Sequence, residues 1–247
     1  MKYLPYQRLT DAFSLKKREL ISLAGAGGKT TFMYTLAREL GDDNKKVITT
    51  TTTRIRIPAK NDTEKLIIDK DGKLPSDTFK KYKHVTCVAG IDSDGKAIGI
   101  IPSIIDEWKS TLNADCIIVE ADGSKGKPFK APIIEYEPII PSKTTLYVPL
   151  VGIDILRKPL NEEYVHRPNI VAELTSTKLG DDVTISTVRS IMQYYLKIQP
   201  KSSRSAIYVN KVSNRFQRED AISLTREINS DRIFGDLLKK RFWRITK

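Results

Sequence analysis

A glycine-rich run near the N-terminus has the residue types needed to hold a chain of phosphates. Several backbone N–H groups must converge on the phosphate oxygens, and glycines let the main chain come that close. A lysine and two threonines follow, and they can neutralise phosphate charge and bind Mg²⁺ through a hydroxyl. We therefore predict a nucleotide-binding turn formed by Gly25, Ala26, Gly27, Gly28, Lys29, Thr30 and Thr31.

The turn is shorter than the standard phosphate-binding loop. That pattern has a glycine five residues before Gly28, where this chain has Leu23. The shortened form, G-x-G-G-K-T-T, is as similar to the G-x-x-G-K-T-T turn of Mur-type peptide ligases as to the standard loop. We expect Lys29 to reach the β- and γ-phosphates and Thr30 to bind the metal ion.

Two carboxylates follow the most strongly apolar segment of the chain. Residues 116–119 have the pattern of a buried strand, and Glu120 and Asp122 stand at its carboxyl end. In parallel α/β sheets this edge adjoins the phosphate turn, and acids there hold Mg²⁺ or orient a water molecule. We predict that Lys29, Glu120 and Asp122 are catalytic and that Thr30, Glu120 and Asp122 bind the metal.

Further polar segments could contact the nucleotide or a second, anionic ligand. Asn210-Lys211 resembles the start of the N-K-x-D element with which GTPases read guanine, but Ser213 replaces its aspartate. We therefore expect Asn210 and Lys211 near the nucleotide, with ATP favoured and GTP as an alternative. Hydroxyl and cationic groups suit an anion, although a solvated basic loop explains the lysines equally well. The candidates for a second ligand are Thr51, Arg54, Lys125, Lys130, His166 and Arg167.

A parallel α/β sheet would bring these segments together. An apolar strand at 20–24, helical spacing over 29–41 and a strand at 46–50 begin a right-handed crossover. Further strands are predicted at 85–90, 116–120, 145–151 and 206–210, and helices at 102–112, 188–196 and 216–228. We predict a P-loop NTPase-like three-layer sandwich, as one nucleotide-binding domain over 1–247. Residues from about 212 could form a small C-terminal lobe.

Composition narrows the class of protein. The chain has 247 residues, no long apolar run and two cysteines inside predicted strands, so we expect buried thiols, a cytoplasmic location and no membrane partner. The formal charge is +12, which attracts anionic ligands. The basic segment 239–244 is predicted to be a solvated end whose Phe242 and Trp243 dock on the domain. Because nucleic-acid-binding signatures are absent, we do not expect nucleic acid as the partner.

Several motifs together resemble the YqeC-like family, described as accessory proteins of selenium-dependent molybdenum hydroxylases. They are E-A-D-G-S-K at 120–125, P-F-K-A-P at 128–132 and E-P-I-I-P at 137–141, together with the glycine turn, T-T-T at 49–51, G-I at 90–91, H-R-P at 166–168 and N-K at 210–211. One departure is Tyr136, where the family often has histidine. The resemblance implies an NTP-binding fold and a role in maturing such a hydroxylase.

The sequence supports one main functional hypothesis and three alternatives. The main hypothesis is a Mg²⁺-dependent NTP-binding accessory protein that hydrolyses NTP or transfers a phosphoryl or nucleotidyl group, with the hydroxylase or its cofactor as partner. The alternatives are a non-catalytic, nucleotide-switched chaperone, a Mur-type ATP-dependent amide ligase and a basic nucleic-acid-binding module. Whether the chain is an enzyme stays open at this point.

Overall fold

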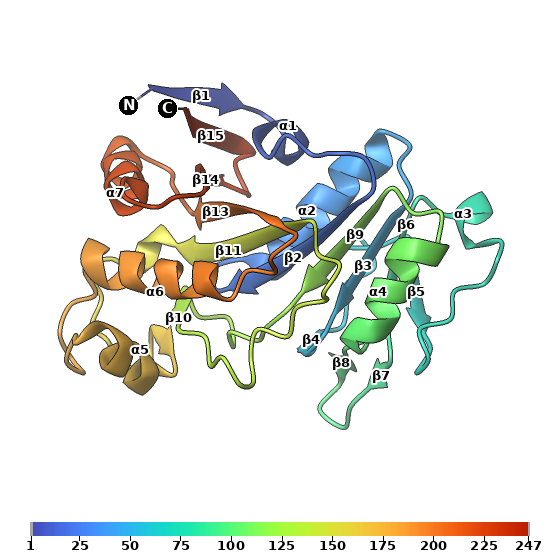
Figure 1. The fold of residues 1–247 in the computed structure, drawn as a ribbon, viewed down its shortest axis with the longest axis horizontal. Coiled ribbons are helices and arrows are strands. Elements are labelled where there is room, and N and C mark those ends of the chain that lie inside the picture. Colours follow the sequence, from blue (N-terminus) through green and yellow to red (C-terminus); the bar gives the residue numbers. More distant parts are fainter. Residues whose placement is uncertain (1, 247) are drawn as a thin grey trace.

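The computed structural model describes residues 2–246, and a ten-stranded mixed sheet forms its centre (Figure 1). The strand order is β1-β15-β14-β13-β11-β2-β9-β3-β6-β5. The eight strands from β14 to β5 are parallel, whereas β15 is antiparallel to both of its neighbours. The predicted α/β class is therefore confirmed, whereas the sheet, predicted to be parallel, is mixed because β15 is antiparallel.

The strands of the main sheet are β1 (Lys2–Tyr6), β2 (Glu19–Gly25), β3 (Val47–Thr51), β5 (Lys65–Ile68), β6 (His84–Val88), β9 (Cys116–Glu120), β11 (Leu146–Gly152), β13 (Arg204–Asn210), β14 (Asp231–Asp236) and β15 (Arg241–Thr246). Two small sheets lie beside it. One comprises β4 (Arg54–Arg56), β7 (Gly90–Ile91) and β8 (Lys96–Ile98), and the other β10 (Phe129–Lys130) and β12 (Val165–His166).

Helices cover both faces of the sheet. They are α1 (Leu9–Ala12), α2 (Lys29–Asp42), α3 (Thr78–Lys81), α4 (Pro102–Thr111), α5 (Pro168–Thr175), α6 (Ile185–Lys197) and α7 (Arg215–Thr225), with a 3₁₀ turn at Ile153–Ile155. Figure 1 shows α4 and α6 on the near side of the sheet and α2 on the far side.

Alternating side chains of the strands explain these layers. On β2, Ile21 and Leu23 pack in the cluster that contains Phe32 of α2, whereas Leu20 packs with Trp108 of α4. Because successive side chains of a strand point to opposite faces, each central strand is buried on both sides. The parallel strands then deliver their carboxyl ends, and the residues that follow them, to one edge of the sheet.

The C-terminal segment differs from the sequence prediction. Residues 241–246 form β15, which pairs with β14 on one side and with β1 on the other, so this end is not a solvated tail. Phe242 is fully buried, and Trp243 stacks on Phe234 with ring centroids 5.5 Å apart. The docking of the two aromatic residues was expected, but the strand was missed. Both β14 and β15 extend the main sheet.

Two other expectations concern burial and the membrane. Cys87 and Cys116 are buried free thiols, as predicted. Within residues 2–246, none of the helices has the length and apolar character that crossing a lipid bilayer requires.

His84, the first residue of β6, makes the stability of the fold pH-dependent. Its side chain is buried and its Nε2 lies 2.9 Å from Thr49 Oγ1. Burial, with a smaller effect of Arg38, lowers the pKa of His84 to about 4. The unfolded chain takes up this proton at about pH 6.5, so the stabilisation is complete above about pH 6.5 and is lost as the pH falls towards about 4.

We therefore expect His84→Gln, which cannot be protonated, to flatten the acid limb of the stability curve. The difference between the pKa of His84 in the folded and in the unfolded chain corresponds to a loss of about 3 kcal/mol in the free energy of unfolding, from above about pH 6.5 to below about pH 4. Urea unfolding of both proteins at several pH values measures it. Parallel curves for the two proteins would show that His84 does not titrate in this way.

Candidate functional site

The turn after β2 has a backbone shape that favours glycine. Gly25, Gly27 and Gly28 have φ angles of +92°, +83° and +124°. A Cβ atom on Gly25 would lie 2.3 Å from the carbonyl oxygen of Leu150, and one on Gly27 would lie 2.2 Å from the backbone nitrogen of Gly152. The turn is therefore pressed against the carboxyl end of β11, backbone on backbone.

The backbone amides of the turn fall into two groups. Those of Gly25, Ala26 and Gly27 donate to Asp122 Oδ2 and to the carbonyl oxygens of Leu150 and Lys127, at 3.0, 3.0 and 3.2 Å. Those of residues 28–31, where α2 begins, have no acceptor within residues 2–246. Free amides at a helix N-terminus favour an anion. The first half of the turn is thus fastened to the protein, and the second half can receive phosphate.

Lys29 lies between the two predicted catalytic acids. Its buried Nζ donates to the carbonyl oxygen of Gly25 at 2.6 Å and lies 3.2 Å from Asp122 Oδ1 and 3.6 Å from Glu120 Oε1. Burial lowers the pKa of Lys29, but the attraction of Asp122 and Glu120 outweighs it and raises the pKa above its usual value. The structure therefore brings the three predicted catalytic residues together around a charged ammonium group.

Thr30 and Glu120 are the residues best placed to share a metal ion. The Thr30 hydroxyl donates to Glu120 Oε2 at 2.7 Å, and both residues line the pocket described below. Burial raises the pKa of Glu120, and Lys29 and Thr30 oppose that rise. Mg²⁺ is commonly held by one or two carboxylates together with phosphates and water. The pair fits this pattern, although no group of three or more metal-binding residues occurs within residues 2–246.

Asp122 supports the turn rather than lining the pocket. It is fully buried, and its Oδ2 accepts from the Gly25 amide and from the Tyr195 hydroxyl at 3.3 Å. Lys130 Nζ also lies 3.2 Å from this oxygen. These contacts favour a positioning role for Asp122, whereas the other two predicted metal ligands, Thr30 and Glu120, line the pocket. Tyr195 was missed because its spacing on α6 is that of an apolar face.

A chain of buried charges connects the glycine turn to the opposite wall of the pocket. Lys130 is completely buried, and its Nζ donates to Glu137 Oε2 at 2.9 Å and to the carbonyl oxygen of Gly123 at 2.7 Å. Arg167 Nη1 lies 3.3 Å from the same Glu137 oxygen. Three cations and three carboxylates alternate in the order Glu120, Lys29, Asp122, Lys130, Glu137, Arg167. The sequence did not assign Glu137 to the site.

A pocket of about 1240 Å³ opens beside α2. Eight lysines and arginines line it against only three glutamates, so its lining is strongly cationic. The basic residues are Lys29, Arg54, Arg56, Lys96, Lys125, Lys127, Arg167 and Lys211, and the acids are Glu120, Glu137 and Glu162.

The candidates for a second ligand separate into two groups. Arg54, Lys125, His166 and Arg167 line the pocket, whereas Lys130 lies in the charge chain. Thr51 is also buried, and its hydroxyl donates to the backbone oxygen of Glu120 at 2.8 Å. Thr52 and Thr53 take its place in the pocket wall.

His166 is a neutral group in this wall. Partial burial and the neighbouring cations Lys130 and Arg167 lower its pKa to about 4. Its imidazole therefore adds no charge near neutral pH and offers one hydrogen-bond donor and one acceptor.

Asn210 holds the glycine turn from behind. Its Nδ2 donates to the carbonyl oxygen of Gly27 at 2.7 Å, and its Oδ1 accepts from the Leu237 amide at 3.4 Å. Lys211 lines the pocket and pairs with Asp154 at 2.6 Å. Asn210 is therefore placed to fix the shape of the turn. Of these two residues, Lys211 is the one that lines the pocket.

Removing the buried cation of Lys29 should be costly. Lys29→Met leaves Glu120 without a cation, because Asp122 retains Lys130, and we expect the free energy of unfolding to fall by about 3 kcal/mol. The double variant Lys29→Met/Glu120→Gln should recover much of that loss because it removes the unpaired carboxylate. Chemical denaturation of the two variants and of Glu120→Gln alone measures this coupling. An equal loss of unfolding free energy in Lys29→Met and in the double variant would contradict the pairing of Lys29 with Glu120.

Comparison with known proteins agrees with the motifs at this site. The family model described as "YqeC protein" matches residues 21–169, which span the glycine turn, the acids and His166-Arg167. The uncharacterized protein YqeC of Escherichia coli (strain K12) is 29% identical over 223 residues, covering 89% of this chain and 85% of that protein. Because the family match extends over more than half of the chain, this protein belongs to the YqeC family.

Proposed function

We propose that this protein binds the triphosphate of a nucleotide at the start of α2, with Mg²⁺, and cleaves or transfers part of it. The observation that carries the proposal is the convergence of free amides at residues 28–31 with a buried Lys29 and the Thr30–Glu120 pair. Amides at a helix N-terminus, a cation and a metal-binding hydroxyl are together the chemistry that a polyphosphate requires. On this proposal the sheet and turn act as a P-loop-like nucleotide-binding fold.

Each residue has a distinct role in the proposed reaction. The amides of residues 28–31 and Lys29 neutralise the charge that develops on the phosphate oxygens. Bound Mg²⁺ would supply further charge neutralisation, and Thr30 with Glu120 would hold it. Glu120 also contacts both Thr30 and Lys29, so it is placed to orient a water molecule or an acceptor hydroxyl. Asp122 and Asn210 keep the turn in the shape that presents the amides.

The family supports a biological setting for this chemistry. On the resemblance described above, we place the nucleotide reaction in the maturation of a selenium-dependent molybdenum hydroxylase, in the cytoplasm, with the hydroxylase or its cofactor as partner. Ser213 occupies the position of the guanine-reading aspartate, which favours ATP. Hydrolysis, phosphoryl transfer and nucleotidyl transfer are distinguished by whether phosphate or pyrophosphate is released.

The buried charge chain favours one other candidate function, a nucleotide-switched chaperone. A ligand that draws Lys29 towards its phosphates would weaken the contact of Lys29 with Asp122, and Lys130 and Arg167 lie further along the same chain. Such a protein would change its partner binding with nucleotide while turning over slowly. Rapid turnover without a partner would decide against it.

Thr30→Val tests the metal site. Valine keeps the branched shape but removes the hydroxyl, so we expect the affinity for ATP in the presence of Mg²⁺ to fall about tenfold. Affinity without Mg²⁺ should change little. Thr35→Val is the matched control, since Thr35 lies on the same helix and does not line the pocket. Titration calorimetry with and without Mg²⁺ measures both, and equal affinities of Thr30→Val and the control would contradict the assignment.

Glu120→Gln tests the catalytic assignment. The substitution keeps the size of the side chain but removes its charge, and we expect ATP turnover to fall at least about 100-fold. Phosphate and pyrophosphate release measure the turnover, with circular dichroism as the check on folding. Unchanged turnover in a folded variant would remove Glu120 from the mechanism.

A further inference from the structure

We infer that the part of the pocket outside the glycine turn and α2 binds a second, phosphorylated small molecule, through Arg54, Lys96 and Lys125 together with the loop 123–127. The inference rests on the proposed function in one respect, because this molecule would be the acceptor or co-substrate of the nucleotide reaction. The subsite itself depends only on residues outside the glycine turn and α2.

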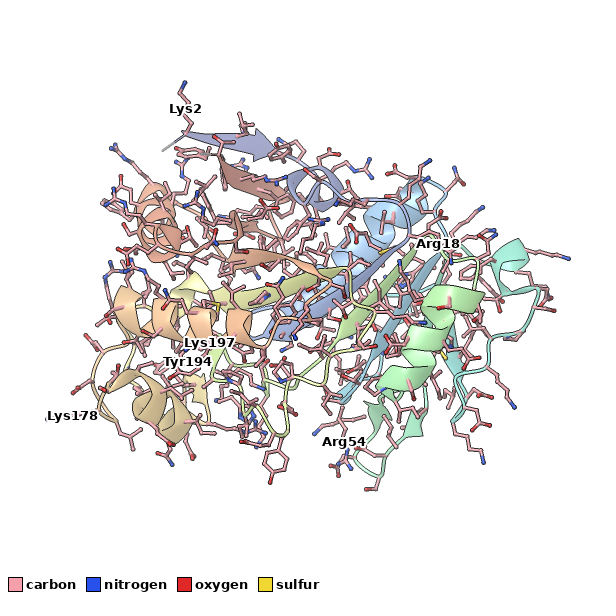
Figure 2. The ribbon with its side chains drawn as sticks, viewed as in Figure 1. Lys2, Arg18, Arg54, Lys178, Tyr194 and Lys197 are labelled. Carbon is pink, nitrogen blue, oxygen red and sulfur yellow. The ribbon has the colours of Figure 1, made fainter. Side chains whose placement is uncertain are left out.

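The pocket is larger than one phosphate tail requires. Its volume of about 1240 Å³ exceeds the range of about 300–1,000 Å³ that is usual for small-molecule sites. The start of α2 forms one wall. The other walls come from β4 and β8, from the loop 123–127, and from β12 with Arg167. Figure 2 shows Arg54 at the end of the sheet where β3 stops.

The cations of the proposed subsite are only partly balanced by protein carboxylates. Lys96 and Lys125 are exposed and have no ion-pair partner within residues 2–246, and Arg54 lies 3.6 Å from its partner Asp92. Glu120 and Glu137 already face cations of the charge chain. Positive groups gathered around a concave surface repel one another and raise the local concentration of anions. An anionic ligand would remove that repulsion.

The loop 123–127 supplies the features that favour phosphate. All five of its residues line the pocket, and the backbone amides of Ser124, Lys125 and Gly126 have no acceptor in the described chain. Lys125 and Gly126 have φ angles of +48° and +74°. A Cβ atom at Gly123 or Gly126 would meet nothing within 4 Å, so the backbone is open at these points. Free amides beside a lysine form the kind of cradle that holds phosphate oxygens.

The two halves of the pocket are directly joined. The amide of Gly27 donates to the carbonyl oxygen of Lys127 at 3.2 Å, so the glycine turn and the loop 123–127 touch. A phosphorylated molecule on the loop would therefore lie beside a triphosphate on α2. This proximity is what transfer between two bound substrates requires.

Inorganic pyrophosphate is a suitable probe because it carries only the recognised group. In calorimetric titrations with Mg²⁺, we expect two pyrophosphates per chain, and one in the presence of saturating ATP. The variant Lys96→Gln/Lys125→Gln should weaken binding in the presence of ATP at least about tenfold and leave ATP affinity within about twofold. Both side chains are exposed, so the fold should be unaffected, and circular dichroism checks this.

The control is Lys70→Gln/Lys178→Gln, which removes two exposed charges away from the pocket. Lys178 and Arg54 are well separated in Figure 2. Equal weakening by the control, no pyrophosphate binding in the presence of saturating ATP, or unchanged binding in Lys96→Gln/Lys125→Gln would each overturn the second subsite. None of these results bears on the first site, whose failure appears separately as unchanged ATP binding in Thr30→Val.

Discussion

The contact between the glycine turn and the end of β11 is the constraint on which the site depends. The Ala26 amide donates to the Leu150 carbonyl oxygen at 3.0 Å, and Gly25 and Gly27 leave no room for a side chain there. Because β11 adjoins β2 in the sheet, this contact fixes where α2 can begin. Residues 28–31, which carry the free amides, then lie at the pocket, and the buried ammonium group of Lys29 lies beside it.

Charge balance explains why so many ionisable groups can be buried beside that turn. An isolated buried ion is strongly disfavoured, whereas alternating partners with further hydrogen bonds offset much of the desolvation. Asp122 satisfies two lysines, a backbone amide and a tyrosine hydroxyl at once. The same chain passes from the turn to Arg167 on the far wall, so the two halves of the pocket share one electrostatic network.

Part of the overall formal charge of +12 is located around the pocket. Eight lysines and arginines line a single pocket with three glutamates. A cavity lined in this way raises the local concentration of small anions. On the proposed function, a helix N-terminus with free amides and a cationic cavity are the two features that favour phosphorylated small molecules.

Local spacing in the sequence was enough to predict the glycine turn, the lysine and threonine at the start of α2, the acids at the end of β9 and the parallel strands at the centre of the sheet. Those features depend on neighbouring residues and on strand periodicity. The tertiary structure alone decided that Asp122 and Lys130 are buried, that Lys96 joins the pocket and that β15 lies between β14 and β1. Residues 2–6 and 241–246 are neighbours only after folding, and a side chain's charge does not reveal which distant partner will neutralise it.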